Sequence, residues 1–339
     1  MFLNIKSIHD ESCNCIEDLI ISIAHWLQLD YEILFANGWG FEFKLHAEKN
    51  PEFIIGRMMN SGKERLFVEK NLGIKQKKIE VKNHEEIISE IKNEIMNERP
   101  LIIYIDSYWN TCDYNYQKSH YYYHTILAIG FDSINNTIIY IDPYTAPGKI
   151  AKMSTIDLKE GFKPEIIKLE FIKNAKKVNW CGIINNTIVK LDGKNLSETK
   201  FGDSIKNFAN YVEHNLDFSI ESEGFEHPRN QWPFFKVLQE VFRGRKQFSK
   251  FLKYCSCKYD IKGFLPLSES LEKAAFEWDI IRNLLQKATI FDKLNSIIRK
   301  ASAIRKASAN IQKVATFEEN LLLDLKKIME KYNADVNYD

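Results

Sequence analysis

A cysteine, a histidine and an aspartate, which together can perform nucleophilic catalysis, lie at the ends of predicted helices and strands in this 339-residue sequence. Cys15 precedes an apolar pattern with helical spacing, His124 opens an apolar strand-like run, and Asp142 closes the next such run. A cysteine thiolate can attack an acyl carbon, an imidazole can carry the proton, and a carboxylate can orient the imidazole. We therefore interpret Cys15, His124 and Asp142 as a candidate catalytic triad.

The segment 120–144 predicts the hairpin that would position two of these side chains. Two runs rich in β-branched residues, 126–129 and 137–141, are joined by a short Asn-rich turn, which is typical of an antiparallel hairpin. Such a hairpin puts His124 at the mouth of one strand beside Asp142 at the end of the next. We expect Asp142 to accept the Nδ1–H of His124 and to leave Nε2 free as a base.

The third member of the candidate triad stands where a helix is expected to begin. Apolar residues recur at three- and four-residue steps across 19–27, which indicates an amphipathic helix. Glu17 and Asp18 fall in its first turn, where acids suit the positive end of the helix dipole. The unpaired N–H groups at a helix start stabilise a thiolate, which favours Cys15 as the nucleophile. Cys13, two residues earlier, stays open as an alternative.

Apolar runs elsewhere in the first half of the chain predict the rest of a sheet. Isoleucines share one side of an amphipathic helix over 81–97, and buried strands are indicated at 101–106, 166–171 and 180–191. Together with the hairpin, these runs predict an α+β domain in which the N-terminal helix packs on an antiparallel sheet.

From about residue 200 the pattern changes to continuous helical periodicity. Apolar residues recur at helical spacing through 201–218, 233–254, 268–288 and 291–332. We therefore expect a catalytic domain over residues 1–195 and a helical domain over residues 196–339.

Short motifs around the triad resemble those of papain-like cysteine peptidases. The sequence Cys-Asn-Cys at 13–15 looks like their Ser-Cys-x-x-Cys signature, shortened by one residue. The stretch 124–131 is similar to their His-x5-Gly-Tyr strand, and the Asp-Pro pair at 142–143 matches the acid that follows. The whole set, with the Gly-Trp-Gly-Phe loop at 38–41 and the Asp-Ser-Tyr strand end at 106–108, resembles the butirosin-biosynthesis acyltransferase (BtrH-like) family over residues 1–190.

That resemblance implies a papain-like fold used for acyl transfer rather than for proteolysis. An acyl or peptidyl group would pass from a carrier-protein thioester to Cys15 and then to a small amine, in nonribosomal peptide-type antibiotic biosynthesis. The sequence also resembles the cysteine-protease homologues that form amides in closthioamide-type pathways. The phosphopantetheine would belong to the carrier protein, and this chain would need no cofactor. No glutamine precedes Cys15, so backbone N–H groups are expected to hold the oxyanion.

Two other functions fit parts of the same pattern. A cysteine peptidase or amidase would use the same triad with water as the acceptor. A binding module without catalytic activity would use the helical domain to hold an acidic partner.

Six further residues are candidates for contacting substrate. Asp106 ends a strand, where it could pair with an amine acceptor or simply cap the strand end. Aromatic residues and a tight glycine loop could line the site; these candidates are Trp39, Gly40, Phe41, Tyr108 and Trp109.

Metal and nucleic-acid chemistry have weaker signals. His120 and His124 could share a strand face, but no acidic third ligand follows a zinc pattern. Residues 229–313 carry 18 Lys and Arg against 7 Asp and Glu, with basic clusters at 243–253 and 299–306. This face could be merely solvated, could dock an acidic carrier protein, or could bind nucleic acid, although no nucleic-acid motif accompanies it. We expect a carrier protein and not nucleic acid.

Composition points to a cytoplasmic protein. The first residues lack the apolar core of a signal peptide, and no apolar run reaches the ~18–20 residues that span a bilayer. Six cysteines in a chain of this length do not form a disulfide framework, so the thiols are expected to stay reduced. The sequence leaves the oligomeric state open.

Overall fold

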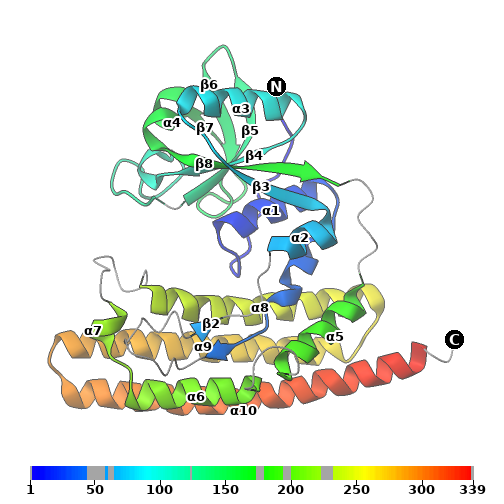
Figure 1. Cartoon of the computed structure of the whole chain (residues 1–339), viewed down its shortest axis with the longest axis vertical. Helices are drawn as coiled ribbons and strands as arrows, with labels where there is room; N and C mark the ends of the chain where they lie inside the picture. Colours follow the sequence, from blue (N-terminus) through cyan, green and yellow to red (C-terminus); the bar gives the residue numbers. More distant parts are fainter. Residues whose placement is uncertain are drawn as a thin grey trace. The chain divides into compact units, whose positions relative to one another are not determined.

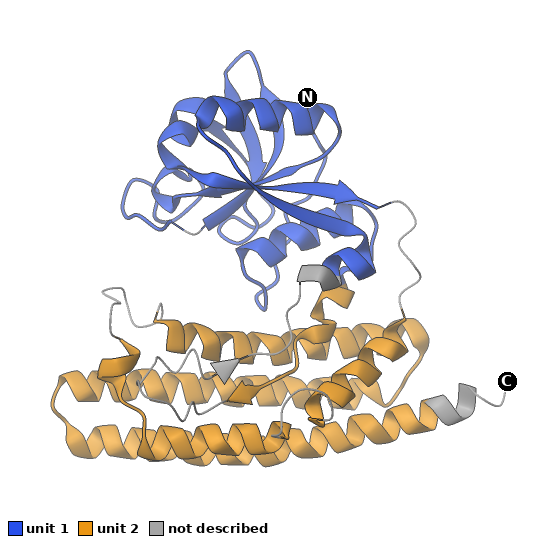
Figure 2. Cartoon of the chain, viewed as in Figure 1, with its two compact units in different colours: residues 1–31, 64–178 blue, residues 32–63, 179–339 orange. Residues whose placement is uncertain are grey.

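The computed structural model describes residues 2–43, 58–59, 65–122, 124–172, 179–193, 200–222 and 232–336. The chain forms two compact units (Figure 2). Unit 1 consists of residues 1–31 and 64–178, and unit 2 consists of residues 32–63 and 179–339. The predicted domains, 1–195 and 196–339, therefore differ from the units in two ways. The second unit begins at residue 179, and it also takes in the segment 32–63.

Unit 1 is an α+β unit built on an antiparallel six-stranded sheet (Figure 1). The predicted strand at 101–106 and both strands of the predicted hairpin are confirmed as its centre. In spatial order the strands are β3 (Ile74–Glu80), β8 (Phe162–Phe171), β4 (Leu101–Ile105), β5 (His124–Asp132), β6 (Thr137–Ile141) and β7 (Ile150–Ser154).

The turn between β5 and β6 has a local cause. The carboxylate of Asp132 accepts the backbone N–H groups of Ile134 and Asn135 at 3.1 and 3.2 Å. Asn136 takes a left-handed backbone with φ of 48°, which Asn tolerates better than most residues. This turn sets the register in which Phe131 of β5 faces Ile138 of β6, and a bulge between Ala128 and Gly130 then shifts the register so that Leu127 faces Ile141.

Helices bury both faces of the sheet. β5 is buried along almost its whole length, because α1 (Cys15–Trp26) contacts it from one side and α3 (His84–Met96) from the other (Figure 1). The predicted N-terminal helix and the helix predicted at 81–97 are thus confirmed. Unit 1 also contains α2 (Arg65–Leu72), α4 (Thr155–Gly161) and the short 3-10 helix η3 (Ser107–Trp109).

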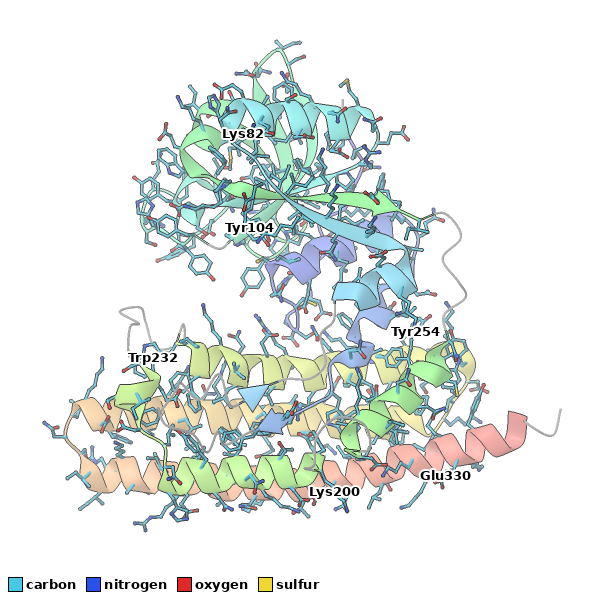
Figure 3. All side chains as sticks on the ribbon, in the orientation of Figure 1. Lys82, Tyr104, Lys200, Trp232, Tyr254 and Glu330 are labelled. Carbon is cyan, nitrogen blue, oxygen red and sulfur yellow. The ribbon has the colours of Figure 1, made fainter. Side chains whose placement is uncertain are left out.

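Unit 2 is mainly helical, as predicted for the C-terminal half. Its long helices α8 (Pro233–Tyr259), α9 (Phe264–Lys293) and α10 (Ile297–Val336) pack in sequence, and α6 (Phe201–His214) lies against α10. Figure 3 labels Trp232, which immediately precedes α8, and Tyr254 near the other end of this helix. The remaining elements are η1 (Tyr31–Asn37), β1 (Glu42–Phe43), β2 (Met58–Met59), α5 (Trp180–Leu191) and α7 (Phe218–Glu221). Among the described residues, no helix has the length and apolar character to cross a bilayer.

The strand predicted at 180–191 is wrong, because this segment forms helix α5. The side chain of Asn179 accepts the N–H of Gly182 at 2.8 Å and caps the helix start. Trp180 packs against the rings of Tyr259 and Phe264. Packing on long helices has overridden the strand preference of a segment rich in β-branched residues.

A buried ion pair organises the core of unit 2. Arg245 of α8 and Glu318 of α10 are both fully buried and form two parallel bonds of 3.0 Å. Each carboxylate oxygen of Glu318 also accepts an indole N–H at 2.7 Å, one from Trp39 and one from Trp278. The Arg245 guanidinium donates in addition to the carbonyl of Gly40 at 2.7 Å. The segment 32–43 is thereby fastened to the helices.

This pair corrects the predicted basic face on α8. Arg245 was expected to lie on a cationic surface, but it is fully buried and neutralised by Glu318. Arg243 is also mostly buried and contacts Glu240 at 3.2 Å. A charged side chain is buried at low cost only when it is paired and hydrogen-bonded, and the sequence run alone does not reveal the partner.

Candidate active site

Cys15 is the first residue of α1, as the sequence predicts. Asn14 caps the helix: its side chain accepts the N–H of Glu17 at 3.0 Å, and the Glu17 carboxylate accepts the N–H of Asn14 at 2.9 Å. This reciprocal capping box leaves the N–H groups of Cys15 and Ile16 without a partner among the described residues. Both are donors at the positive end of the helix, beside the sulfur.

His124 and Asp142 meet at the ends of β5 and β6. The imidazole Nε2 lies 2.6 Å from Oδ2 of Asp142, and both side chains are buried. The expectation that Nδ1 would bind the acid is therefore wrong. The ring is turned so that Nε2 donates to Asp142. Nδ1 is the nitrogen left for Cys15, whose thiol is near enough to the imidazole for each group to shift the pKa of the other.

The electrostatics of the three groups favour a thiolate–imidazolium pair. Burial alone would raise the pKa of the Cys15 thiol, but the hydrogen bond and charge of His124 outweigh it and lower the pKa below 9.0. Burial alone would lower the pKa of His124, but Asp142 and then Cys15 raise it to about 10. Burial would raise the pKa of Asp142, and its bond to His124 lowers it instead. The charged form of each group is thus stabilised by its neighbour.

A set of polar residues that the sequence analysis did not single out holds Asp142 in place. Oδ2 accepts the side-chain amide of Asn110 at 2.7 Å and the hydroxyl of Thr145 at 2.5 Å, in addition to His124. The hydroxyl of Tyr140 donates to Oδ1 of Asn110 at 2.8 Å, which fixes the amide. Asn110 is fully buried. The sequence feature that could have identified it is its place as a polar residue between two aromatic segments.

Two residues of unit 1 approach the sulfur from β5 and the preceding loop. Thr125 helps to lower the pKa of the Cys15 thiol, although its buried hydroxyl makes no hydrogen bond to any of the described residues. Thr125 faces Tyr104 of β4, which is labelled in Figure 3. Burial raises the pKa of Tyr121, and the nearby charges of Cys15 and Tyr144 raise it further.

The structure separates the two cysteines between which the sequence left a choice. Cys13 is fully buried, and its N–H donates to the carbonyl of Asp10. Cys15 is partly accessible and is the thiol that interacts with His124. The geometry of the site therefore favours Cys15.

Asp106 serves the loop in which it stands. Its carboxylate accepts Nδ1 of His120 at 2.6 Å and the N–H groups of Tyr108 and Tyr121 at 3.1 and 2.9 Å. These contacts fit the strand-end cap that the sequence analysis kept open. His120 lies before β5, stacked on Tyr108, and Trp109 covers Gly161. A role for Asp106, Tyr108 or Trp109 in binding substrate stays a prediction.

Trp39, Gly40 and Phe41 belong to unit 2. Trp39 and Gly40 bind the ion pair described above, and Phe41 stacks on Trp278 at 5.3 Å. Trp39 and Phe41 are only 3% and 4% exposed. Their contacts support a structural role in the helical core, and their predicted contact with substrate stays a prediction.

Comparison with known proteins leaves the site to be interpreted from its own geometry. No protein-family model matches the sequence, and no curated protein matches it significantly. Among the described residues, no three His, Cys, Asp or Glu side chains converge in a way that could hold a metal ion.

Proposed function

We propose that this protein is an acyltransferase that forms a thioester on Cys15 and passes the acyl group to an amine. The observation that supports this proposal best is a Cys15 thiol whose pKa His124 lowers, while the imidazole of His124 is bonded to the buried carboxylate of Asp142. A thiol with a lowered pKa at a helix start, beside an imidazole held by a buried carboxylate, is the arrangement that nucleophilic catalysis at an acyl carbon requires.

In the first half-reaction, the Cys15 thiolate attacks the carbonyl carbon of an acyl thioester. The oxyanion that forms faces the unpartnered N–H groups of Cys15 and Ile16, which supply fixed donors. The intermediate collapses when the bond from carbon to the donor sulfur breaks. The departing thiolate takes the proton from Nδ1 of His124, and a neutral imidazole and an acylated Cys15 remain.

In the second half-reaction, a neutral amine attacks the carbonyl carbon of the acyl-enzyme. Its surplus proton passes to Nδ1 of His124, and the carbon–sulfur bond to Cys15 breaks. The products are the amide and the thiolate–imidazolium pair with which the cycle began. Asp142 holds Nε2 throughout and stabilises each imidazolium that forms.

The α+β organisation of unit 1 supports the papain-like fold as part of the same proposal. A helix that begins with the cysteine packs on an antiparallel sheet, and adjacent strands of that sheet carry the histidine and the acid. The motif resemblance to the BtrH-like acyltransferases is what favours an amine over water as the acceptor and a carrier-protein thioester, as in closthioamide-type biosynthesis, as the donor.

The basic side chains of α10 support a carrier protein as partner. Arg243 and Arg245 are buried on α8, where Lys253 stays exposed. The exposed cations of the second predicted cluster are Arg299, Arg305 and Lys306, with Lys313 two turns on. Carrier domains are typically acidic, and charge complementarity would steer them to such a face.

Intact-protein mass spectrometry with a small acyl thioester tests the nucleophile. An acyl adduct should form on the wild type and on Cys13→Ala and be absent from Cys15→Ala. An adduct that requires Cys13 would overturn the choice of nucleophile, and the absence of any adduct on the wild type would overturn the covalent mechanism.

The products then separate transfer from hydrolysis. With a primary amine present, amide should accumulate in preference to free acid. Free acid as the sole product, at every amine concentration, would mean that the acceptor is water and that the protein is a hydrolase.

A further inference from the structure

A second histidine–carboxylate pair lies one helical turn from Cys15, and the steps above do not use it. Nδ1 of His9 is 2.6 Å from Oδ2 of Asp18, which is fully buried on α1. The other oxygen of Asp18 accepts the backbone N–H of Asp10 at 3.0 Å. The His9 ring is thus oriented by a fixed acid, in the same manner as His124.

One phenol ring contacts both histidines. The ring of Tyr144 meets His9 edge-on at 6.0 Å and lies 6.3 Å from His124. Tyr144 is also near Tyr121: burial raises the pKa of Tyr121, and the charges of Cys15 and Tyr144 raise it further. His9 is therefore at the edge of the candidate site.

The free side of His9 is accessible. The side chain is 30% exposed, and Nε2 has no hydrogen-bond partner among the described residues. Because Nδ1 faces Asp18, Nε2 is the nitrogen that an incoming molecule can reach.

An amine that reaches the site as its ammonium ion needs a second proton acceptor, in addition to His124. A primary alkylamine is an ammonium ion at neutral pH, with an ordinary pKa near 10, and an ammonium ion cannot attack a carbonyl. It must lose one proton before attack and a second during amide formation. The neutral imidazole of His124 has one basic nitrogen and can accept only one of them, so the other proton must pass to another base or to solvent.

We propose that His9, held by Asp18, takes the first proton from the ammonium group of the acceptor amine, and so prepares the amine for attack on the acyl-enzyme at Cys15. This inference rests on the proposed acyl transfer. Among the described residues, the charged and titratable groups near His9 and its partner Asp18 are Asp10, whose backbone N–H donates to Asp18 and whose charge acts on it, and Tyr144 from the loop after β6. The two carboxylates favour a cation in front of His9, and solvent takes the proton from Nε2 afterwards.

The experiment compares two nucleophiles on the full chain, with His9→Gln as the variant. A simple acyl thioester of N-acetylcysteamine loads Cys15, and amide formation is followed with a primary alkylamine and with methoxyamine. Methoxyamine is neutral at neutral pH and needs no prior deprotonation. His25→Gln is the matched control, because His25 is an exposed histidine at the far end of the same helix.

In His9→Gln, the ratio of the alkylamine rate to the methoxyamine rate should fall about 100-fold, the lower range for a lost acid–base group. Raising the pH should recover the alkylamine rate, since the free-amine fraction grows about tenfold per pH unit below the amine pKa. His25→Gln should match the wild type with both nucleophiles.

Equal losses with both nucleophiles would mean that His9 only supports the structure, and no loss with either would mean that it has no role. Both results overturn this inference while leaving acyl transfer intact, provided that the adduct on Cys15 still forms. A wild type that forms no adduct at all would overturn acyl transfer itself, and with it the role of His9.

Discussion

The buried ion pair of unit 2 allows a sharp test of the fold with two neighbouring residues. Glu318→Gln removes one charge and leaves Arg245 buried without a counter-ion. The amide that replaces the carboxylate has one acceptor oxygen for four N–H donors, and its own NH2 group faces donors only. Removal of one partner from a buried pair lowers the free energy of unfolding by about 3–5 kcal/mol.

The matched control is Glu319→Gln on the same helix. Glu319 binds Lys206 at 2.8 Å, but both side chains are about one-third exposed. An exposed pair of this kind contributes about 0–1 kcal/mol. The same chemical change, one position along the chain, should therefore have a much smaller effect.

Denaturant unfolding followed by tryptophan fluorescence measures both variants. Trp39 and Trp278 donate to Glu318, so two of the six tryptophans report on this part of unit 2. Because two units can unfold separately, the transition assigned to unit 2 should be analysed by itself. Equal midpoints for Glu318→Gln and Glu319→Gln would refute the reasoning, since they would mean that the buried pair contributes no more than an exposed one.

Three further outcomes are expected. Alkylation of Cys15 by iodoacetamide should persist at pH values below 9.0, because the lowered pKa keeps the thiolate present there. The alkylation rate should fall as the pH falls through that pKa, and His124→Gln should move the midpoint of this pH profile upward. Asn110→Ala should lower the free energy of unfolding by about 1–3 kcal/mol, because it removes a buried donor to Asp142, as thermal denaturation would measure. Arg305→Glu should slow acyl transfer from a carrier-bound donor about tenfold at low salt, as quenched time-course assays would measure.

Each of these outcomes has a result that contradicts it. An unchanged alkylation profile in His124→Gln would mean that the imidazole does not set the thiol pKa. An unaltered melting temperature in Asn110→Ala would mean that Asp142 is held without the amide. For Arg305→Glu, an equal loss with the N-acetylcysteamine donor, which has no carrier domain, would exclude docking as the cause.

The elements around the candidate triad could be predicted because their signals are local. The helix start at Cys15 follows from acids and apolar periodicity within a few residues, and the hairpin follows from two β-branched runs and an Asn-rich turn. The ring orientation of His124 could not be predicted in this way, since it depends on where both the thiol and the carboxylate lie in space.

Pairing across long sequence distances is what the sequence alone does not reveal. Trp39 is fixed by Glu318, 279 positions away, and Arg245 is neutralised by the same residue. The buried arginine therefore looks like part of a basic surface, and the packing role of the loop at 38–41 is hidden. The strand predicted at 180–191 failed for a related reason, because packing on α8 and α9 decided its conformation.

The discontinuous course of the chain has a consequence for any attempt to shorten the protein. Residues 32–43 are enclosed by helices that come from beyond residue 200, with Phe43 against Phe208 and Tyr211 and its N–H bound by Ser204. A truncation that ends at residue 178 would strip these aromatic side chains of their cover and invite aggregation. Expression of the sheet unit by itself would require excision of 32–63 and a short linker in its place.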